Sequence, residues 1–223
     1  MLALLGSCAG LALMQGWVEL PPNAVPWAPP DLAQPPGLFA HLQVNRLADR
    51  PDACIAALDA AQARFARLPD RATGERCGFS NVVRLDRGPI AFNHPAQTRC
   101  VLAAALVWYE HELDGIAQRT LAARVVRIDH LGTYACRNVN SESDGARSEH
   151  ATANAIDVAG YVLSDGRVIS VARDWAKPTA EGRFLAQAHD AACRVFNGVL
   201  GPAYNRLHAN HFHLDMGPYR MCR

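Results

Sequence analysis

Two apolar runs joined by a turn signal make up residues 155–173, AIDVAGYVLSDGRVISVAR. The tripeptide SDG at 164–166 is typical of a tight hairpin, so the runs 155–163 and 167–173 predict two antiparallel strands. Further apolar runs of strand length occur at 82–85, 90–92, 124–128, 133–136 and 211–216. Together these runs indicate a small, mostly antiparallel sheet.

Helical periodicity accounts for most of the remaining apolar residues. Apolar residues repeat at helical spacing in 53–68, 98–121 and 181–200, and Gly201-Pro202 stops the last segment. The longest segment, 98–121, is expected to be the principal core helix. Since the chain has no internal repeat and is long enough to bury one substantial core, we expect one α+β domain with helices flanking the sheet.

The first fifty residues differ in composition from the rest. Residues 1–16 are apolar and uncharged, as in an export signal. LGSC at 5–8 also fits a lipoprotein-type leader, in which Cys8 would be lipidated and anchor the chain to a membrane, with a buried or spare cysteine as the alternative. Half of the fourteen prolines lie between Pro21 and Pro36, so residues 17–50 predict a stiff, extended tether, with a disordered terminus as the alternative. The folded domain is therefore expected at 51–223.

The cysteine count indicates an oxidising compartment. Outside the leader the cysteines are Cys54, Cys77, Cys100, Cys136, Cys193 and Cys222. An even, dispersed set without a C-x-x-C spacing favours three disulfides over a thiolate metal site, although fifteen pairings are open. Together with the leader, this predicts an exported protein of the periplasm or cell envelope. Six reduced core cysteines in the cytosol are the alternative.

The charge balance excludes some partners. The chain has 22 basic and 21 acidic residues and a formal net charge of +1, which produces no field that would attract nucleic acid. We therefore expect no nucleic-acid partner. The sequence gives no indication of the oligomeric state.

Two short patterns contain residue types that bind metals. His150 and Asp157 are separated by six residues in SEHATANAIDV, 148–158, between a polar loop and the first strand of the hairpin. In HANHFHLD, 208–215, His211 and His213 stand two apart on a predicted strand and so point to the same face. Two histidines and one carboxylate are a recurring ligand set of hydrolytic zinc.

These patterns resemble two related families. SEHATANAIDV followed by a hairpin and HFHLD is similar to the zinc D,D-peptidases that cut bacterial cell-wall peptides through a His-x6-Asp and His-x-His site. More narrowly, YACR at 134–137, the cysteines from Cys54 onward and LGPAYNRLHANHFHLD at 200–215 resemble the bacterial extensin-like C-terminal domain family over about residues 50–223. The resemblance implies a zinc D,D-peptidase-like fold braced by disulfides.

The peptidase resemblance also implies roles for individual residues. His150, Asp157 and His213 would hold Zn²⁺, and His211 would orient or deprotonate the attacking water. His208 stands where some murein endopeptidases carry another histidine and is a second candidate base.

Two more residues, Arg137 and Asp215, have a functional interpretation and a purely structural alternative. Arg137 would grip a substrate carboxylate or steady the oxyanion, with a structural ion pair as its alternative. Asp215 would hold a ligand imidazole in the right tautomer, with a solvated charge at a strand end as its alternative.

The chain departs from the peptidase pattern at two points. Ala153 stands three residues after the first ligand, where those enzymes usually carry glycine, and no Glu-x-x-His precedes the last ligand. The second departure leaves histidine as the nearby base.

Three functions remain open at this stage. We expect a zinc-dependent D,D-endopeptidase or carboxypeptidase that hydrolyses amide bonds of peptidoglycan stem peptides or crosslinks. A zinc amidase cutting the sugar–peptide bond and a non-catalytic, envelope-anchored wall-binding module are the alternatives. Metal content and the masses of muropeptide digestion products would separate them.

Overall fold

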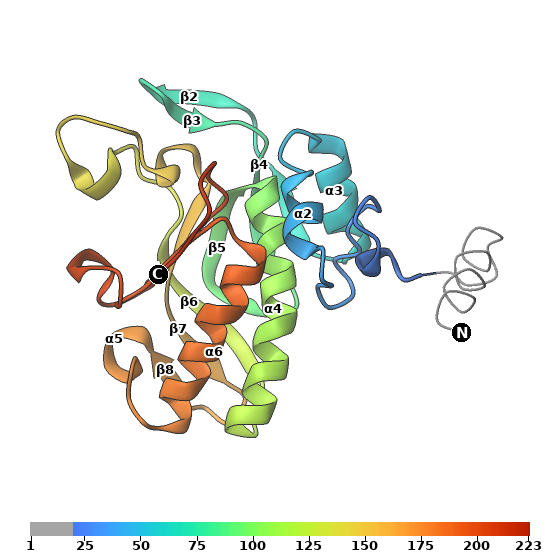
Figure 1. Cartoon of the computed structure of the whole chain (residues 1–223). Helices are drawn as coiled ribbons and strands as arrows, with labels where there is room; N and C mark the ends of the chain where they lie inside the picture. The colour runs from blue at the N-terminus through green and yellow to red at the C-terminus, as the bar shows by residue number, and fades with distance from the viewer. Residues whose placement is uncertain (1–19) are drawn as a thin grey trace, which may run out of the picture.

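The computed structural model describes residues 20–223 (Figure 1). The predicted leader and the proposed lipidation at Cys8 lie outside these residues. Within the described part of the chain, no helix is both long and apolar enough to cross a membrane.

A mixed sheet forms the centre of the domain. Its strands run in the order β1-β4-β5-β6-β7-β10-β9-β11, and β8 pairs with β7 as well. The bounds are β1 Arg64–Arg67, β4 Val82–Arg87, β5 Ala91–Arg99, β6 Val125–Gly132, β7 Ala155–Leu163, β8 Val168–Ser170, β9 Gly198–Leu200, β10 Phe212–Asp215 and β11 Met221–Cys222. Only the β5/β6 and β9/β11 pairs are parallel. The predicted α+β class and mostly antiparallel pairing are therefore confirmed, although the sheet is larger than expected.

Two antiparallel strands stand apart from this sheet. These are β2 (Arg71–Gly74) and β3 (Cys77–Phe79), which the sequence analysis missed. Figure 1 shows their hairpin projecting beyond the body of the domain, next to the loop that precedes β7. Its strands are too short and polar to give a periodic signal.

The helices pack against the sheet and one another. They are α2 (Ala40–Asn45), α3 (Pro51–Ala60), α4 (Cys100–Leu121), α5 (Val171–Asp174) and α6 (Ala180–Val195), with short 3₁₀ turns η1 (Pro22–Ala24), η2 (Val139–Ser141), η3 (Glu149–Thr152) and η4 (Arg206–His208). α4 and α6 lie side by side (Figure 1). Because α4 is buried continuously from Cys100 to Glu110, it is the core helix that the sequence predicts.

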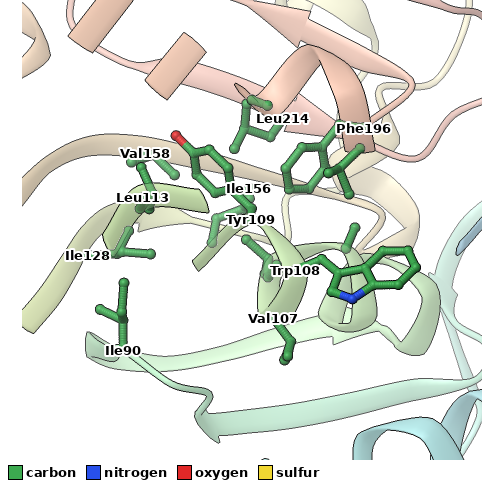
Figure 2. Close-up of a cluster of buried hydrophobic side chains, with 14 of the residues drawn as sticks. Ile90, Val107, Trp108, Tyr109, Leu113, Ile128, Ile156, Val158, Phe196 and Leu214 are labelled. Carbon is green, nitrogen blue, oxygen red and sulfur yellow. The ribbon is translucent and has the colours of Figure 1, made fainter. Parts of the chain in front are cut away.

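The core joins α4 to the strands that carry the candidate site. Figure 2 shows Tyr109 of α4 among Ile156 and Val158 of β7 and Leu214 of β10, all fully buried. The Tyr109 hydroxyl is hydrogen-bonded to the Tyr161 hydroxyl at 2.7 Å, which satisfies both polar groups inside the core. β7 and β10 are thereby packed against the buried face of α4.

Three disulfides connect segments that are distant in the sequence. They join Cys54 to Cys100, Cys77 to Cys136 and Cys193 to Cys222. The prediction of three disulfides from six cysteines is confirmed, and the pairing that the sequence left open is now assigned. Such bridges are typical of proteins of an oxidising compartment, such as the periplasm.

Several element boundaries differ from the sequence predictions. The helix predicted for 53–68 ends at Ala60, because Gln62 adopts a left-handed backbone (φ 56°) and 64–67 turns into β1. The helix predicted to reach 200 ends at Val195, and 198–200 is recruited as β9 by pairing with β10. Residues 133–136 form no strand, and the strand predicted for 167–173 is confined to β8 before α5 begins.

The predicted tether is wrong for residues 20–50. Leu32, Val44 and Leu47 are buried in the main core, and the Trp108 indole nitrogen donates to the carbonyls of Asp31 and Gln34 at 3.1 Å. The segment contains the short 3₁₀ turn η1 and the helix α2, and its apolar residues pack onto α4. The proline count alone could not reveal this packing.

Candidate metal centre

Strand pairing places the key residues next to one another. Asp157 on β7 and His213 on β10 are direct partners in the antiparallel register. His150 lies in η3, which precedes β7, and the Ser148 hydroxyl caps this turn by accepting from the His150 backbone N–H at 3.3 Å. The expected convergence of three residues from separate segments is therefore present.

Three donor atoms of this group form a nearly equilateral triangle. His150 Nε2 lies 3.1 Å from Asp157 Oδ1 and 3.1 Å from His213 Nδ1, and His213 Nδ1 lies 3.0 Å from Asp157 Oδ1. Ligands about 2.0–2.1 Å from a tetrahedral zinc ion are roughly 3.3 Å apart, so the triangle fits the donor spacing of such a site. Among the described residues these three could hold a metal ion together.

The outer nitrogen of each imidazole is occupied by an acceptor. His150 Nδ1 donates to the Thr133 carbonyl at 3.2 Å, and His213 Nε2 donates to Asp215 Oδ2 at 3.2 Å. In the neutral imidazoles these contacts place the ring proton on the outer nitrogen, so that the inner nitrogen directs a lone pair at the common centre. Of the two roles considered for Asp215, the structure shows the contact to His213.

Two glycines make room for the Asp215 carboxylate. A Cβ on Gly198 of β9 would lie 1.9 Å from Asp215 Oδ2, and the Gly217 N–H donates to Asp215 Oδ1 at 2.7 Å. Residues 198–200, which the sequence predicts as helix, form strand β9, and this strand has a local function. It brings a residue without a side chain against the carboxylate that orients His213.

The charges of the group are strongly coupled in the metal-free protein. Burial opposes ionisation of Asp157, but hydrogen bonds from His150 and His213 outweigh it and hold the pKa of Asp157 far below its usual range. Burial likewise lowers the pKa of His213, and the carboxylates of Asp157 and Asp215 override it and raise that pKa to about 9. These contacts hold Asp157 and His213 in their charged forms.

His211 and His208 lie beside the triangle but do not belong to it. His211 Nε2 is 3.4 Å from Asp157 Oδ1, while its Nδ1 donates to Asn210 Oδ1 at 2.8 Å. The His208 ring lies 5.3 Å from that of His211 and 5.8 Å from that of His213, centroid to centroid. Three donors without a fourth protein ligand are typical of catalytic rather than structural zinc sites.

Both of these histidines are expected to be neutral at pH 7. Burial lowers the pKa of His211, and the Asp157 carboxylate offsets this only in part. Burial lowers the pKa of His208 to about 4, and repulsion from the protonated forms of His213 and His211 contributes to this shift. A neutral imidazole with a free nitrogen is the form that accepts a proton.

One known family matches most of the chain. The family described as extensin-like protein C-terminus matches residues 52–223. The chain belongs to this family. No curated protein and no solved structure matches it significantly.

The extensin-like domain has a cleft over the triangle, with a volume of about 670 Å³. Asp157, His213, His211 and His208 line it, and so does Arg137 of the loop that precedes η3. His150 is buried beneath them. All three residues predicted to act on substrate therefore face the same cleft.

Several cleft residues carried no signal in the sequence. Glu149 lines the cleft, and its Oε2 accepts from Asn154 Nδ2 at 2.6 Å. Tyr204 and the largely exposed Tyr219 add an aromatic rim. They lie in irregular segments that only the tertiary fold brings to the site, so no local periodicity could reveal them.

Ala153 of the extensin-like domain adopts the backbone that usually favours glycine. Its φ is 54°, and its side chain is fully buried. The tight turn between η3 and β7 is thus kept, at the cost of roughly 1 kcal/mol of strain that glycine would avoid.

A second group of potential ligands is already used otherwise. His189, Cys193 and Cys222 also lie close enough for a metal, but Cys193 and Cys222 are joined in a disulfide. His189 Nε2 donates to the Arg223 carbonyl at 3.1 Å. Neither sulfur is a free thiolate, so within residues 20–223 the His150 group is the better metal candidate.

Proposed function

We propose that this chain is a zinc-dependent peptidase of the bacterial cell envelope, hydrolysing amide bonds of peptidoglycan stem peptides or crosslinks. The observation that carries the proposal is the triangle of His150, Asp157 and His213 donor atoms, with sides of 3.0–3.1 Å, beneath an open cleft. Its resemblance to the His-x6-Asp and His-x-His site supports a D,D-peptidase, of endopeptidase or carboxypeptidase type.

The choice of zinc follows from the chemistry of the donors. Two imidazole nitrogens and one carboxylate oxygen suit Zn²⁺ better than Mg²⁺ or Ca²⁺, because the latter two cations prefer sites made of oxygen donors alone. Zinc bound here would polarise a scissile carbonyl and lower the pKa of a water molecule. Thr133 and Asp215 would keep the two imidazoles in the tautomers that this requires.

The remaining residues supply proton transfer and substrate binding. Because Asn210 holds His211 Nδ1, Nε2 faces the centre and is placed to accept a proton from an attacking water and to return it to the leaving amine. Arg137, which also lines the cleft, is placed to bind a substrate carboxylate. His208 is the second candidate for the proton-transfer role.

The proposal is tested by metal analysis and muropeptide digestion. Purified protein should contain about one zinc per chain, and mass spectrometry should show cleavage of a stem peptide or crosslink. His150→Ala should abolish both, whereas His94→Ala, which changes an exposed histidine outside the cleft, should preserve both.

Other products would redirect the proposal. Release of intact stem peptides from the sugar would identify an amidase. Binding to the wall that survives His150→Ala, with no products at any time, would identify a non-catalytic binding module.

A further inference from the structure

One wall of the cleft is a loop whose own hydrogen bonds close it at the base. Residues 137–149 form this wall, and Ser148 N donates to the Arg137 carbonyl at 3.1 Å while Val139 N donates to the Ala146 carbonyl at 3.0 Å. The Asn138 side chain donates to the carbonyls of Glu142 and Ser143 at 3.0 and 3.1 Å. The loop tip, 140–145, is exposed and makes no strand pairing.

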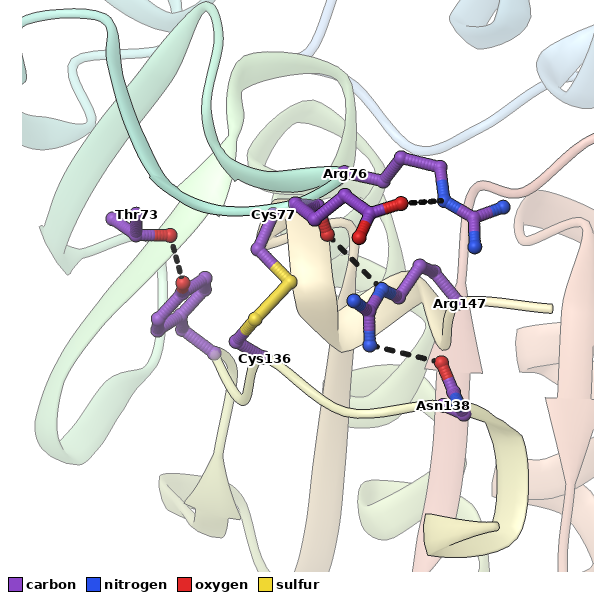
Figure 3. Close-up of a disulfide and its surroundings, with 8 residues drawn as sticks. Thr73, Arg76, Cys77, Cys136, Asn138 and Arg147 are labelled. Carbon is purple, nitrogen blue, oxygen red and sulfur yellow. Dashed lines mark hydrogen bonds and ion pairs between the residues drawn. A yellow bond between two sulfur atoms is a disulfide. The ribbon is translucent and has the colours of Figure 1, made fainter. Parts of the chain in front are cut away.

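The base of this loop is attached to the β2–β3 hairpin. Figure 3 shows the two attachments: the Cys77–Cys136 disulfide holds the residue before Arg137, and Arg147 reaches from the other end of the loop. Arg147 Nε donates to the Glu75 carbonyl at 3.1 Å, and its Nη1 donates to Asn138 Oδ1 at 2.9 Å. A single guanidinium thus joins the hairpin turn to both ends of the loop.

The hairpin is itself firmly seated. Phe79 of β3 packs edge-on against Tyr134, with ring centroids 4.9 Å apart, and the Tyr134 and Thr73 hydroxyls are hydrogen-bonded. Phe79 also belongs to a small apolar cluster with Ala153, next to η3. The hairpin can therefore serve as a fixed support for the loop, because its contacts do not depend on the loop tip.

We propose that Arg147 is a positioning residue, which holds the 137–149 wall, and with it Arg137, in the position that accepts substrate by tying the wall to the β2–β3 hairpin. The inference rests on the proposed function of the cleft. Arg147 does not contact the candidate metal ligands, and its guanidinium is directed to backbone and amide oxygens rather than to the cleft centre. Its effect would be on substrate affinity and not on metal binding.

The neighbouring Arg76 offers a matched control. It lies in the same hairpin turn, its side chain is 66% exposed, and its ion contact with Glu75 is 4.0 Å long. Removing Arg76 changes the local charge as much as removing Arg147 does. Only the latter breaks the connection to Asn138.

The experiment compares Arg147→Ala, Arg147→Lys and Arg76→Ala in the zinc-loaded full chain. Hydrogen–deuterium exchange of residues 137–149, zinc content and the Kd for a purified muropeptide are measured. In Arg147→Ala we expect roughly tenfold faster exchange in the loop and a roughly tenfold weaker Kd, the size of one lost net hydrogen bond, with zinc unchanged. Arg147→Lys should fall between, since one ammonium cannot reproduce the planar fork of the guanidinium. Arg76→Ala should match the parent.

Three outcomes would overturn the inference: loop exchange in Arg147→Ala equal to that of the parent, faster exchange with an unchanged Kd, or loss of zinc together with affinity. The exchange data are independent of activity. If the parent neither binds nor cleaves muropeptides, the proposed function fails. The exchange rate of the loop in Arg147→Ala then still decides whether Arg147 holds the wall: faster exchange than in the parent supports this role, and equal exchange contradicts it.

Discussion

His150 Nε2 and His213 Nδ1 lie 3.1 Å apart, although 63 residues separate the two histidines in the sequence. Their outer nitrogens donate to Thr133 and Asp215, so in the neutral imidazoles both inner nitrogens would present lone pairs to each other and to Asp157. Lone pairs and a carboxylate at this distance repel one another unless a proton or a metal cation lies between them. The fold thus creates a position at the floor of the cleft where a proton or a cation is stabilised.

Asp215→Asn tests whether the outer contact of His213 supports metal binding. An amide is a weaker acceptor for the His213 Nε2 proton, so the imidazole would lose basicity and its fixed tautomer. Such outer contacts typically change metal affinity by about 10–100-fold, and we expect a loss in that range. Competition with a chromophoric chelator measures it. Asp165→Asn, at the exposed β7–β8 turn, is the control, and equal affinities for the two variants would refute the role of Asp215.

Gly198→Ala tests the same carboxylate through its packing. The new Cβ would lie 1.9 Å from Asp215 Oδ2, which forces the carboxylate away from His213. We expect weaker zinc binding, comparable to that of Asp215→Asn, in a protein with an unchanged circular dichroism spectrum. Gly115→Ala is the matched control, because it lies in the α4 interior, where alanine is favoured by up to about 1 kcal/mol. Zinc affinity that is unchanged in Gly198→Ala would contradict this account.

Local sequence signals sufficed for the elements nearest the site. The apolar run of α4 and the SDG turn after β7 placed two central elements within a few residues, because burial and turn chemistry leave direct traces in the sequence. The histidine and aspartate patterns also pointed to the residues that the structure brings together. Their roles as ligands stay a prediction.

Contacts made only in the folded state had no such trace. β9 lies where helical periodicity continues, and it becomes a strand because β10 offers a pairing edge. Arg147 belongs to a polar loop whose composition indicates only exposure, yet it lines the cleft and donates to the carbonyl of Glu75, a residue distant in the sequence. Local propensity could not predict them, since the interactions that fix them are long-range.

Leu32→Ala tests the packing of the segment first expected to be a tether. Leu32 is fully buried, so its truncation should lower the free energy of unfolding by about 2–5 kcal/mol. Leu38, in the same proline-rich region, is 90% exposed, and Leu38→Ala should change stability by less than about 0.5 kcal/mol. Urea denaturation of both variants decides between the two pictures. A detached segment would make the two substitutions equally harmless.

The stability of the domain should also depend on pH through Glu110. This carboxyl group is fully buried in α4, where Oε2 accepts from the Ile90 N–H at 2.8 Å and Oε1 has no partner. Burial raises its pKa well above the usual value, and neither the Ile90 hydrogen bond nor the charge of Arg87 compensates. The folded protein therefore keeps this proton over a pH range in which the unfolded chain has lost it.

The sign of the effect follows from this difference in bound protons. Below the ordinary carboxyl pKa both states are protonated, and above it only the folded state is, so stability falls as pH rises, by up to about 1.4 kcal/mol per unit. Glu110→Gln cannot ionise and should escape the loss. The stability of the variant minus that of the parent should then grow from pH 5 to pH 8 in urea titrations, with all other ionisations common to both. A difference that stays constant over this range would mean that Glu110 does not retain its proton on folding.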